Sequence, residues 1–391
     1  MKYIAFIEIP LANVEQYLEI WKNRVPNNIK IIFPPQILSR TENNFSGVVM
    51  FEPKDFSDNY NYLEKFKSAG FKISISPVWE NTEISEKLVE FREGEKKVEV
   101  EWEKTSIEKL SIGSTRFLEI LPLIDMKSDY SGVKVEPGVS YLVKTEEVNV
   151  LFDVGLNIQE KHPSPLLENM EHFGVALEDI DAIVISHNHG DHVGGGQWAK
   201  NKTFSLSGIQ MDLGKIKVYT PVGMTYPGLD PYHSKNPTQI GKGVATIGVI
   251  SSQLFFSGQT LEQALAVNVE NKGIVLIIGC GHQKIPKLLH RTKALFAESL
   301  YGLVGGLHFP VEGGPINFFG FQPHRIFGIG KEPWNPITRE ELHENISLMK
   351  QYNLQLLALS AHDSSEISME MLRDNFPTTF REIKVGDVIK V

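Results

Sequence analysis

The stretch from residue 183 to 196, IVISHNHGDHVGGG, constrains this chain more than any other part of it. Its first four residues are apolar or β-prone and predict a buried strand. Three histidines and an aspartate follow within six residues, and a run of glycines comes next. Imidazole nitrogen and carboxylate oxygen suit Zn, Fe or Mn, so the cluster predicts a metal site at the end of this strand.

The spacing within the cluster allows its residues to serve two metal ions. If the chain leaves its strand in a tight turn, His187 and His189 point to one metal while Asp191 and His192 point to another. The glycines permit the bend and let the N-terminus of a following helix lie close to the site. The alternative is a polar loop that happens to be rich in histidine. That alternative does not explain why three of the chain's 12 histidines directly follow a buried-strand pattern.

The string HNHGDH at 187–192 resembles the HxHxDH signature of the metallo-β-lactamase superfamily. The resemblance extends from about residue 110 to the C-terminus. Within the superfamily the chain is similar to the branch of dihydropterin-ribofuranosyl-aminobenzene-phosphate synthases. The resemblance implies an α/β fold, an αβ/βα sandwich with a dinuclear metal site at one edge of its two sheets.

The resemblance also assigns ligands further along the chain. A strand pattern at 273–279 runs into Cys280, at the position where many members have an aspartate that bridges the two metals. The histidine that usually precedes this strand is missing, and Gln259 stands in its neighbourhood. His282 is expected to replace that histidine. Cys280 is either a thiolate ligand or a small buried apolar residue at the strand end.

Two more histidines follow apolar strands, and an aspartate precedes the first helix of this part. His308 ends the string GLVGGLHFP, and it is a metal ligand, an acid that polarises the substrate, or a histidine bonded within the core. His362 corresponds by chain order to the superfamily's final ligand. Asp153, in the string DVG, supports the ligand loop or caps a turn. The expected metal ligands are His187, His189, Asp191, His192, Cys280, His282 and His362, and the expected catalytic residues are Asp191 and His308.

The first 80 residues contain no histidine, cysteine or glycine-rich loop. Their apolar periodicity predicts the order βαββαβ of a small ferredoxin-like sandwich. We expect a dimerisation or ligand-sensing module, with a homodimer favoured. The expected strands are 3–9, 29–34, 46–51 and 71–79, and the expected helices are 12–23 and 57–68.

The chain therefore divides into three predicted segments. Residues 1–80 form the ferredoxin-like domain, 81–110 a charged linker or solvated helix dense in Glu and Lys, and 111–391 the catalytic metallo-β-lactamase-fold domain. Pro and Gly over 220–243 predict a long loop. The aromatic stretch 317–336 is expected over the mouth of the site, against a flat substrate; a dimer contact or plain core fits it equally well.

Composition limits the classes of partner and the cellular compartment that we expect for this chain. A net charge of −9 argues against nucleic acid, whose phosphates require a basic face. A single cysteine excludes an internal disulfide framework and favours the reducing cytoplasm. The N-terminus has no signal-peptide pattern, and no stretch approaches the ~20 apolar residues of a membrane span. We expect a cytoplasmic, soluble protein without a membrane partner that acts on a small-molecule substrate.

These observations predict a metal-dependent hydrolase. Two divalent ions, with Zn favoured and Fe or Mn as alternatives, would share a water and lower its pKa enough to provide a metal-bound hydroxide. The expected substrate is a small ester, lactone or phosphoester, and a pterin-related phosphate is suggested by the resemblance alone. The alternatives are a transferase or lyase in pterin-coenzyme biosynthesis, a di-iron redox protein, and a metal-binding sensory protein.

Overall fold

The structure is a computed structural model, and contacts divide the chain into two compact units. Unit 1 comprises residues 1–97, 253–258 and 310–337, and unit 2 comprises 98–252, 259–309 and 338–391. The charged segment forms one helix, α3 (Thr82–Lys104), over most of its length. The two short stretches that join unit 1 from later in the chain were not foreseen from the sequence. The described residues are 3–10, 29–40, 44–53, 71–77, 82–315, 324–325, 328–333 and 335–391.

The N-terminal strands of unit 1 form a four-stranded sheet of order β2-β3-β1-β4, in which all neighbours are antiparallel. Strands β1 and β2 are thus parallel with β3 between them, as two crossovers in a βαββαβ unit require. The expected helices at 12–23 and 57–68 lie outside the described residues, so the ferredoxin-like assignment stays a prediction. The strands are β1 (Tyr3–Pro10), β2 (Ile29–Arg40), β3 (Asn44–Pro53) and β4 (Lys72–Pro77).

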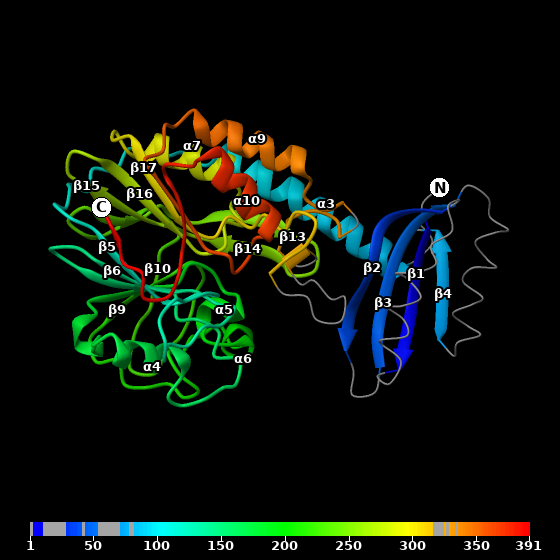
Figure 1. The fold of residues 1–391 in the computed structure, drawn as a ribbon, viewed down its shortest axis with the longest axis horizontal. Coiled ribbons are helices and arrows are strands. Elements are labelled where there is room, and N and C mark those ends of the chain that lie inside the picture. Colours follow the sequence, from blue (N-terminus) through cyan, green and yellow to red (C-terminus); the bar gives the residue numbers. More distant parts are fainter. Residues whose placement is uncertain are drawn as a thin grey trace. The chain divides into compact units, whose positions relative to one another are not determined.

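Unit 2 contains two seven-stranded sheets that face each other (Figure 1). The first sheet has the order β10-β9-β8-β7-β6-β5-β20, and the second has the order β11-β12-β15-β16-β17-β18-β19. The strands of the first are β5 (Glu119–Ile124), β6 (Ser140–Lys144), β7 (Asn149–Phe152), β8 (Ala182–Val184), β9 (Lys217–Thr220), β10 (Tyr232–His233) and β20 (Ile389–Lys390). Those of the second are β11 (Thr238–Gly241), β12 (Val244–Thr246), β15 (Leu265–Val269), β16 (Gly273–Ile278), β17 (Leu300–Gly305), β18 (Leu356–Leu359) and β19 (Phe380–Glu382).

Helices cover the outer faces of both sheets (Figure 1), which confirms the predicted αβ/βα sandwich. The first sheet carries α4 (Pro165–His172), α5 (Gly190–Val193) and α6 (Gly196–Lys200). The second carries α7 (Ile285–Leu295), α9 (Arg339–Lys350) and α10 (Glu366–Asn375). The prediction of an uninterrupted loop over 220–243 was wrong, because β10 and β11 lie within it. A separate two-stranded sheet pairs β13 (Ile250–Leu254) with β14 (Gly258–Glu262).

The main core of unit 2 lies between the two sheets. Strand β16 is buried along its whole length, as expected for a central strand with both faces covered. Side chains from both sheets meet in one cluster, among them Tyr141, Phe152 and Val275, all at 0% exposure. Each such side chain contributes roughly 1.5–3 kcal/mol of transfer free energy. The core therefore fixes the two sheets against each other and defines their shared edge.

That shared edge is where the sequence-predicted ligands emerge. Strands β7, β8 and β9 are parallel to one another, and so are β16, β17 and β18. Parallel strands end at the same edge of a sheet, and the loops after their carboxyl ends form a crevice. The loop after β8 carries 187–192, and the loops after β16, β17 and β18 carry 280–282, 308 and 362.

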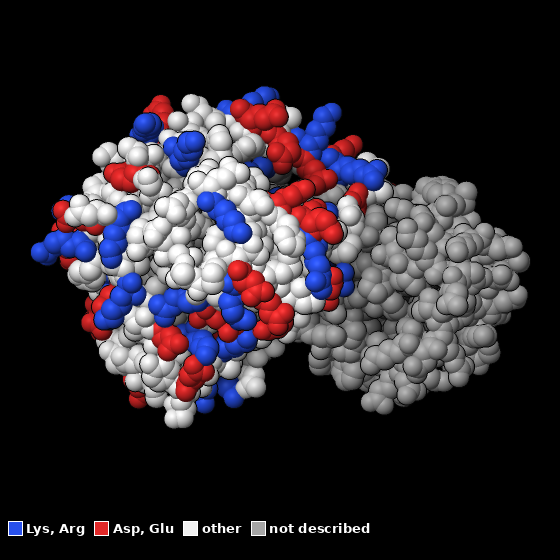
Figure 2. Space-filling view, turned by 45° about the horizontal axis from the view of Figure 1, so that its top comes forward, with Lys and Arg blue, Asp and Glu red and all other residues white. Residues whose placement is uncertain are grey.

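The surface of the described residues shows no single sign of charge on the face drawn in Figure 2, where basic and acidic side chains are intermixed. Among the described helices, none combines the length and the apolar character that crossing a membrane requires.

Candidate metal centre

Three histidines form the first ligand group. Ligand atoms of His187, His189 and His282 all lie within 4.8 Å of one another. His187 Nε2 is 3.1 Å from His189 Nδ1, and the ring of His282 is centred 5.0 Å from each of the other two rings. Burial lowers the pKa of His187 and of His189, which keeps both imidazoles neutral. Neutral imidazole is the form that binds a metal ion.

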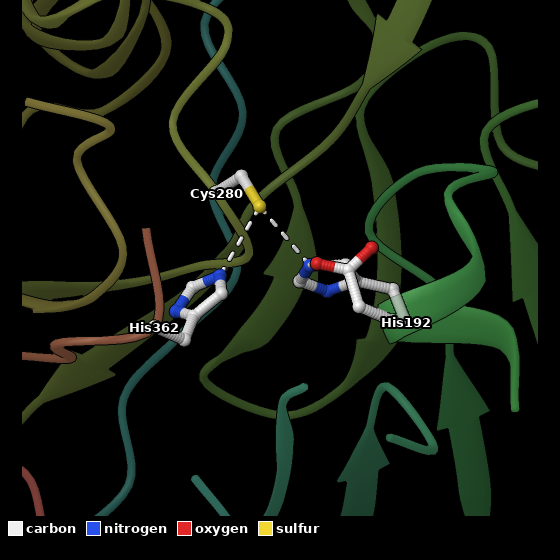
Figure 3. A group of neighbouring side chains, drawn as sticks. His192, Cys280 and His362 are labelled. Atoms are coloured by element: carbon white, nitrogen blue, oxygen red, sulfur yellow. Dashed lines mark hydrogen bonds and ion pairs between the residues drawn. The ribbon is translucent and has the colours of Figure 1, made fainter. Parts of the chain in front are cut away.

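The second group contains Asp191, His192, Cys280 and His362, again with ligand atoms within 4.8 Å of one another. Cys280 Sγ lies between the two rings, 3.1 Å from Nε2 of His192 and 3.1 Å from Nε2 of His362 (Figure 3). Asp191 Oδ2 is 3.4 Å from His192 Nε2. The side chain of Asp191 is 25% exposed, whereas that of His192 is fully buried, so Asp191 forms the solvent-facing side of this group.

Cys280 connects the groups. Its sulfur belongs to the second group and also to a third, formed with His282 and His308. It therefore lies where the second and third groups meet. Burial raises the pKa of the Cys280 thiol well above its usual value. A metal ion must therefore displace the thiol proton for the sulfur to bind as thiolate.

The chemistry of these donors fits transition metals. The two groups offer five imidazoles, one carboxylate and one thiol, a set that suits Zn or Fe and not Mg or Ca. Each group has at least three protein donors, the number that catalytic zinc takes while keeping a position open. The residues present therefore fit a dinuclear site.

Asp153 holds the histidine loop in place. Its carboxylate accepts hydrogen bonds from Ser186 N at 2.6 Å, from Ser186 Oγ at 2.7 Å and from His192 Nδ1 at 2.7 Å. The bond to Nδ1 fixes the ring and leaves Nε2 directed at the second group. Asp153 has the supporting contacts that the resemblance implies.

Glu262 holds the loop of residues 280–282, a role that no sequence pattern predicts. Its fully buried carboxylate accepts the backbone N–H of Cys280 at 3.1 Å, of Gly281 at 3.0 Å and of His282 at 2.8 Å. Burial raises the pKa of Glu262 to about 7, although these hydrogen bonds oppose the rise. Only the three-dimensional pairing of the β14 end with the loop after β16 reveals this role.

His362 is held by a chain of three buried groups that sequence reasoning also missed. Its Nδ1 lies 2.7 Å from Ser360 Oγ, and that hydroxyl donates to Asp125 Oδ1 at 2.8 Å. Asp125 Oδ2 accepts a hydrogen bond from Tyr141 Oη at 2.7 Å. Burial raises the pKa of Asp125 to about 6. The chain fixes the ring of His362 so that Nε2 points to Cys280.

His308 lies beside the first group, where its ring is centred 4.8 Å from that of His282. Its backbone adopts a left-handed φ of 51°, and its N–H donates to Asp363 Oδ2 at 3.0 Å. Gly306 makes this approach possible, because a Cβ there would collide with the carboxylate of Asp363 and the ring of His362. This explains why glycine is required two residues before His308.

The eight predicted site residues thus come together at one edge of unit 2. Neither His233, in the predicted 220–243 loop, nor Gln259, near the position of the missing histidine, belongs to a ligand group of the described residues. His233 Nε2 is 2.9 Å from the Pro221 carbonyl, and Gln259 donates to Glu101 at 3.2 Å. The predicted aromatic contacts of 317–336 fall outside the described residues at Phe318, Phe319, Phe321, Phe327 and Trp334.

Comparison with known proteins adds independent findings. Residues 133–255 match the family model of the metallo-beta-lactamase superfamily. The 7,8-dihydropterin-6-methyl-4-(beta-D-ribofuranosyl)-aminobenzene-5'-phosphate synthase of Methanocaldococcus jannaschii is 23% identical over 253 residues, which cover 51% of this chain and 80% of that protein. The transcription termination factor FttA of Cenarchaeum symbiosum is 42% identical over 53 residues, 14% of this chain and 8% of the factor. The metallo-beta-lactamase fold protein YhfI of Bacillus subtilis is 13% identical, with a TM-score of 0.42, over 71% of this chain and 100% of YhfI.

Proposed function

Because the chain belongs to the metallo-β-lactamase superfamily, we propose that it is a metal-dependent hydrolase of a small ester, lactone or phosphoester. The observation that carries this proposal is the gathering of the ligand groups at one edge of the sandwich, where the Cys280 sulfur belongs both to the second group and to the third, formed with His282 and His308. Among phosphoesters, a pterin-related compound is favoured by the likeness to the Methanocaldococcus enzyme.

The proposed cofactors are two divalent ions, with zinc favoured. His187, His189 and His282 would hold one, and Asp191, His192 and His362 the other, with Cys280 between them. When bound, such ions supply Lewis acidity and a water of lowered pKa.

The chain's own residues would orient the water and the substrate and would exchange protons with them. Asp191 is the part-exposed member of its group, and its carboxylate is placed to accept a hydrogen bond from the water that is added to the substrate. His308, only 6% exposed and packed beside His282, is placed to donate to the substrate oxygen that gains negative charge. Both roles need a fixed geometry, which the buried carboxylates behind the loops provide.

The test combines metal analysis with variant activity. We expect close to two metal ions per chain by mass spectrometry of protein purified without added metal. His189→Ala and His362→Ala are each expected to lose one. Asp191→Ala should lose hydrolysis of p-nitrophenyl acetate, γ-butyrolactone or bis-p-nitrophenyl phosphate, while the exposed Asp374→Ala keeps it. Full turnover by Asp191→Ala, or protein with no bound metal, would refute the proposal.

A role for His308 as a donor is separable from a role as ligand. His308→Ala should lower kcat by about 10²-fold, the usual effect of removing one donor to a developing charge. Its metal content should stay at the wild-type value. Loss of a metal ion in this variant would make His308 a ligand instead.

A second candidate is the transferase or lyase step implied by the name of the Methanocaldococcus relative. Reaction in ¹⁸O-labelled water distinguishes the two. A hydrolase places one labelled oxygen in a product, whereas a condensation of two substrates places none.

A further inference from the structure

Unit 2 contains a cavity of about 880 Å³, and none of its lining residues is a proposed metal ligand. Its walls come from the C-terminal end of α3 and the segment after it, from the ends of β9 and β10, from β13 and β14, and from α7. The volume lies within the range of roughly 300–1,000 Å³ typical of sites for small molecules. The proposed hydrolase chemistry makes no use of this cavity.

A buried cation forms part of the wall. Arg291 on α7 is only 3% exposed, and its Nη1 donates to the carbonyl of Ile247 at 3.0 Å. Its Nε is buried and has no hydrogen-bond partner among the described residues. Burial lowers the pKa of Arg291 to about 10, so the guanidinium remains charged at neutral pH.

No carboxylate of the described part of the chain forms an ion pair with Arg291. The neighbouring Lys287 differs in this respect, because its ammonium lies 2.7 Å from Glu99 Oε1. A buried charge without a counter-ion is unfavourable, and a bound anion would remove that penalty. Arg291 is thus a cation that the fold itself leaves uncompensated.

Trp102 holds this guanidinium in position. The Arg291 Cζ lies 5.2 Å from the centroid of the indole ring, within the distance of a cation–π interaction. Trp102 itself lines the cavity, so its fluorescence can report what enters. The stacking restrains the side chain, and a restrained guanidinium loses less entropy when it binds an anion.

The remaining wall combines positive charge with apolar surface. Lys104, Lys109 and Lys235 line the cavity, against two carboxylates, those of Glu101 and Glu108. Glu101 accepts a hydrogen bond from Gln259, which engages part of that negative charge. The apolar part of the wall includes Ile107, Val249 and Leu261. Basic groups at a concave opening raise the local concentration of anions.

We propose that this cavity is a binding site for a small organic anion, whose phosphate or carboxylate group binds Arg291 and whose apolar body packs on the wall formed by Ile107, Val249 and Leu261. The guanidinium offers its remaining N–H groups in a planar fork that matches a phosphate or a carboxylate. This site is separate from the metal centre and does not depend on the proposed hydrolase activity.

The test measures binding of phenyl phosphate, benzoate and inorganic phosphate to the metal-loaded protein by calorimetry and tryptophan fluorescence. At least one organic anion should bind with 1:1 stoichiometry and change the fluorescence, and Trp102→Phe should abolish that change. Arg291→Gln should weaken binding about tenfold or more, and Arg291→Lys should weaken it less. Lys235→Ala, a substitution at an exposed position that leaves the core intact, should weaken it a few-fold. Lys272→Ala, at an exposed position that does not line the cavity, should not weaken it.

The anion probes could also bind at the metal centre, and a second set of variants distinguishes that site from the cavity. The double variant His189→Ala/His362→Ala should keep the affinity for the anion if the cavity is the site. Binding that is lost in this variant but unchanged in Arg291→Gln and Lys235→Ala would overturn the proposal, as would failure of all three probes to bind. If Arg291→Gln does not fold, Lys235→Ala against Lys272→Ala still decides the question.

Discussion

Ser360→Ala is the substitution that most directly tests how the metal centre is held. Ser360 is 1% exposed, and its hydroxyl takes part in three hydrogen bonds. It accepts from Nδ1 and from the backbone N–H of His362, and it donates to Asp125 Oδ1 at 2.8 Å. Alanine removes all three bonds and adds no bulk.

The substitution should lower both the free energy of unfolding and the affinity for metal. The buried Nδ1–H of His362 and the carboxylate of Asp125 each lose a partner, which should cost about 1–3 kcal/mol in the free energy of unfolding. The ring of His362 also loses the group that orients it. Loss of such an outer hydrogen bond typically lowers metal affinity about 10- to 100-fold.

Ser205→Ala is the matched control. Ser205 is also fully buried, and its hydroxyl donates to the Ile209 carbonyl at 2.8 Å and accepts from Ser207 N at 3.3 Å. Urea unfolding of both variants should show a similar loss of stability. Competition with a chelator should show weaker metal binding for Ser360→Ala alone. Equal metal affinity in both variants would refute the argument that Ser360 positions His362.

Four further outcomes are expected from the same geometry. Cobalt-substituted protein should show a sulfur-to-metal charge-transfer band that Cys280→Ser removes; a wild-type spectrum without the band would exclude thiolate ligation. Asp153→Asn should weaken metal binding about 10- to 100-fold in chelator competition, because the hydrogen bond to Nδ1 of His192 changes. Gly306→Ala should cost roughly 2 kcal/mol or more in urea unfolding, whereas Gly223→Ala, with nothing within 4 Å of its Cβ, should cost little. Burial raises the pKa of Asp125 to about 6, so the folded state retains a proton that the unfolded state releases above pH 3.8. In the metal-free protein this group alone should therefore remove about 2 kcal/mol of stability as pH rises from 4 to 7, and urea unfolding of Asp125→Asn should show a pH dependence reduced by that amount.

The sandwich could be predicted from sequence because its strands are continuous apolar runs. The pattern at 273–279 corresponds to β16, which the surrounding layers bury on both faces. Strands with mixed exposure carry no such pattern. β11, for example, is part-exposed along its length, and the Pro and Gly around it predict a loop. Backbone pairing with β12 stabilises β11 as a strand, and this pairing is not visible in the local sequence.

The ligands could be predicted because metal binding requires particular side chains at the ends of consecutive strands. The residues that hold these ligands in place could not be predicted. Glu262 and Asp125 are ordinary acidic residues in the sequence, far from the ligand loops that they hold. Asp125 reaches Ser360 across 235 residues of chain, and this contact exists only because β5 and β18 belong to sheets that face each other. Cross-sheet contacts of this kind leave no periodic signal in one sequence.

The buried carboxylates around the metal centre share one structural role. Each ligand loop is held by its own carboxylate: Asp153 for the histidine cluster, Glu262 for residues 280–282, Asp125 through Ser360 for His362, and Asp363 for His308. No lysine or arginine of the described residues forms an ion pair with any of the four. Buried anions are stable only with compensating positive charge and hydrogen bonds. In this centre a carboxylate either takes up a proton, as the raised pKa values of Asp125 and Glu262 show, or is compensated by the imidazoles and by cations that they bind. The arrangement that orders the loops therefore also favours metal binding.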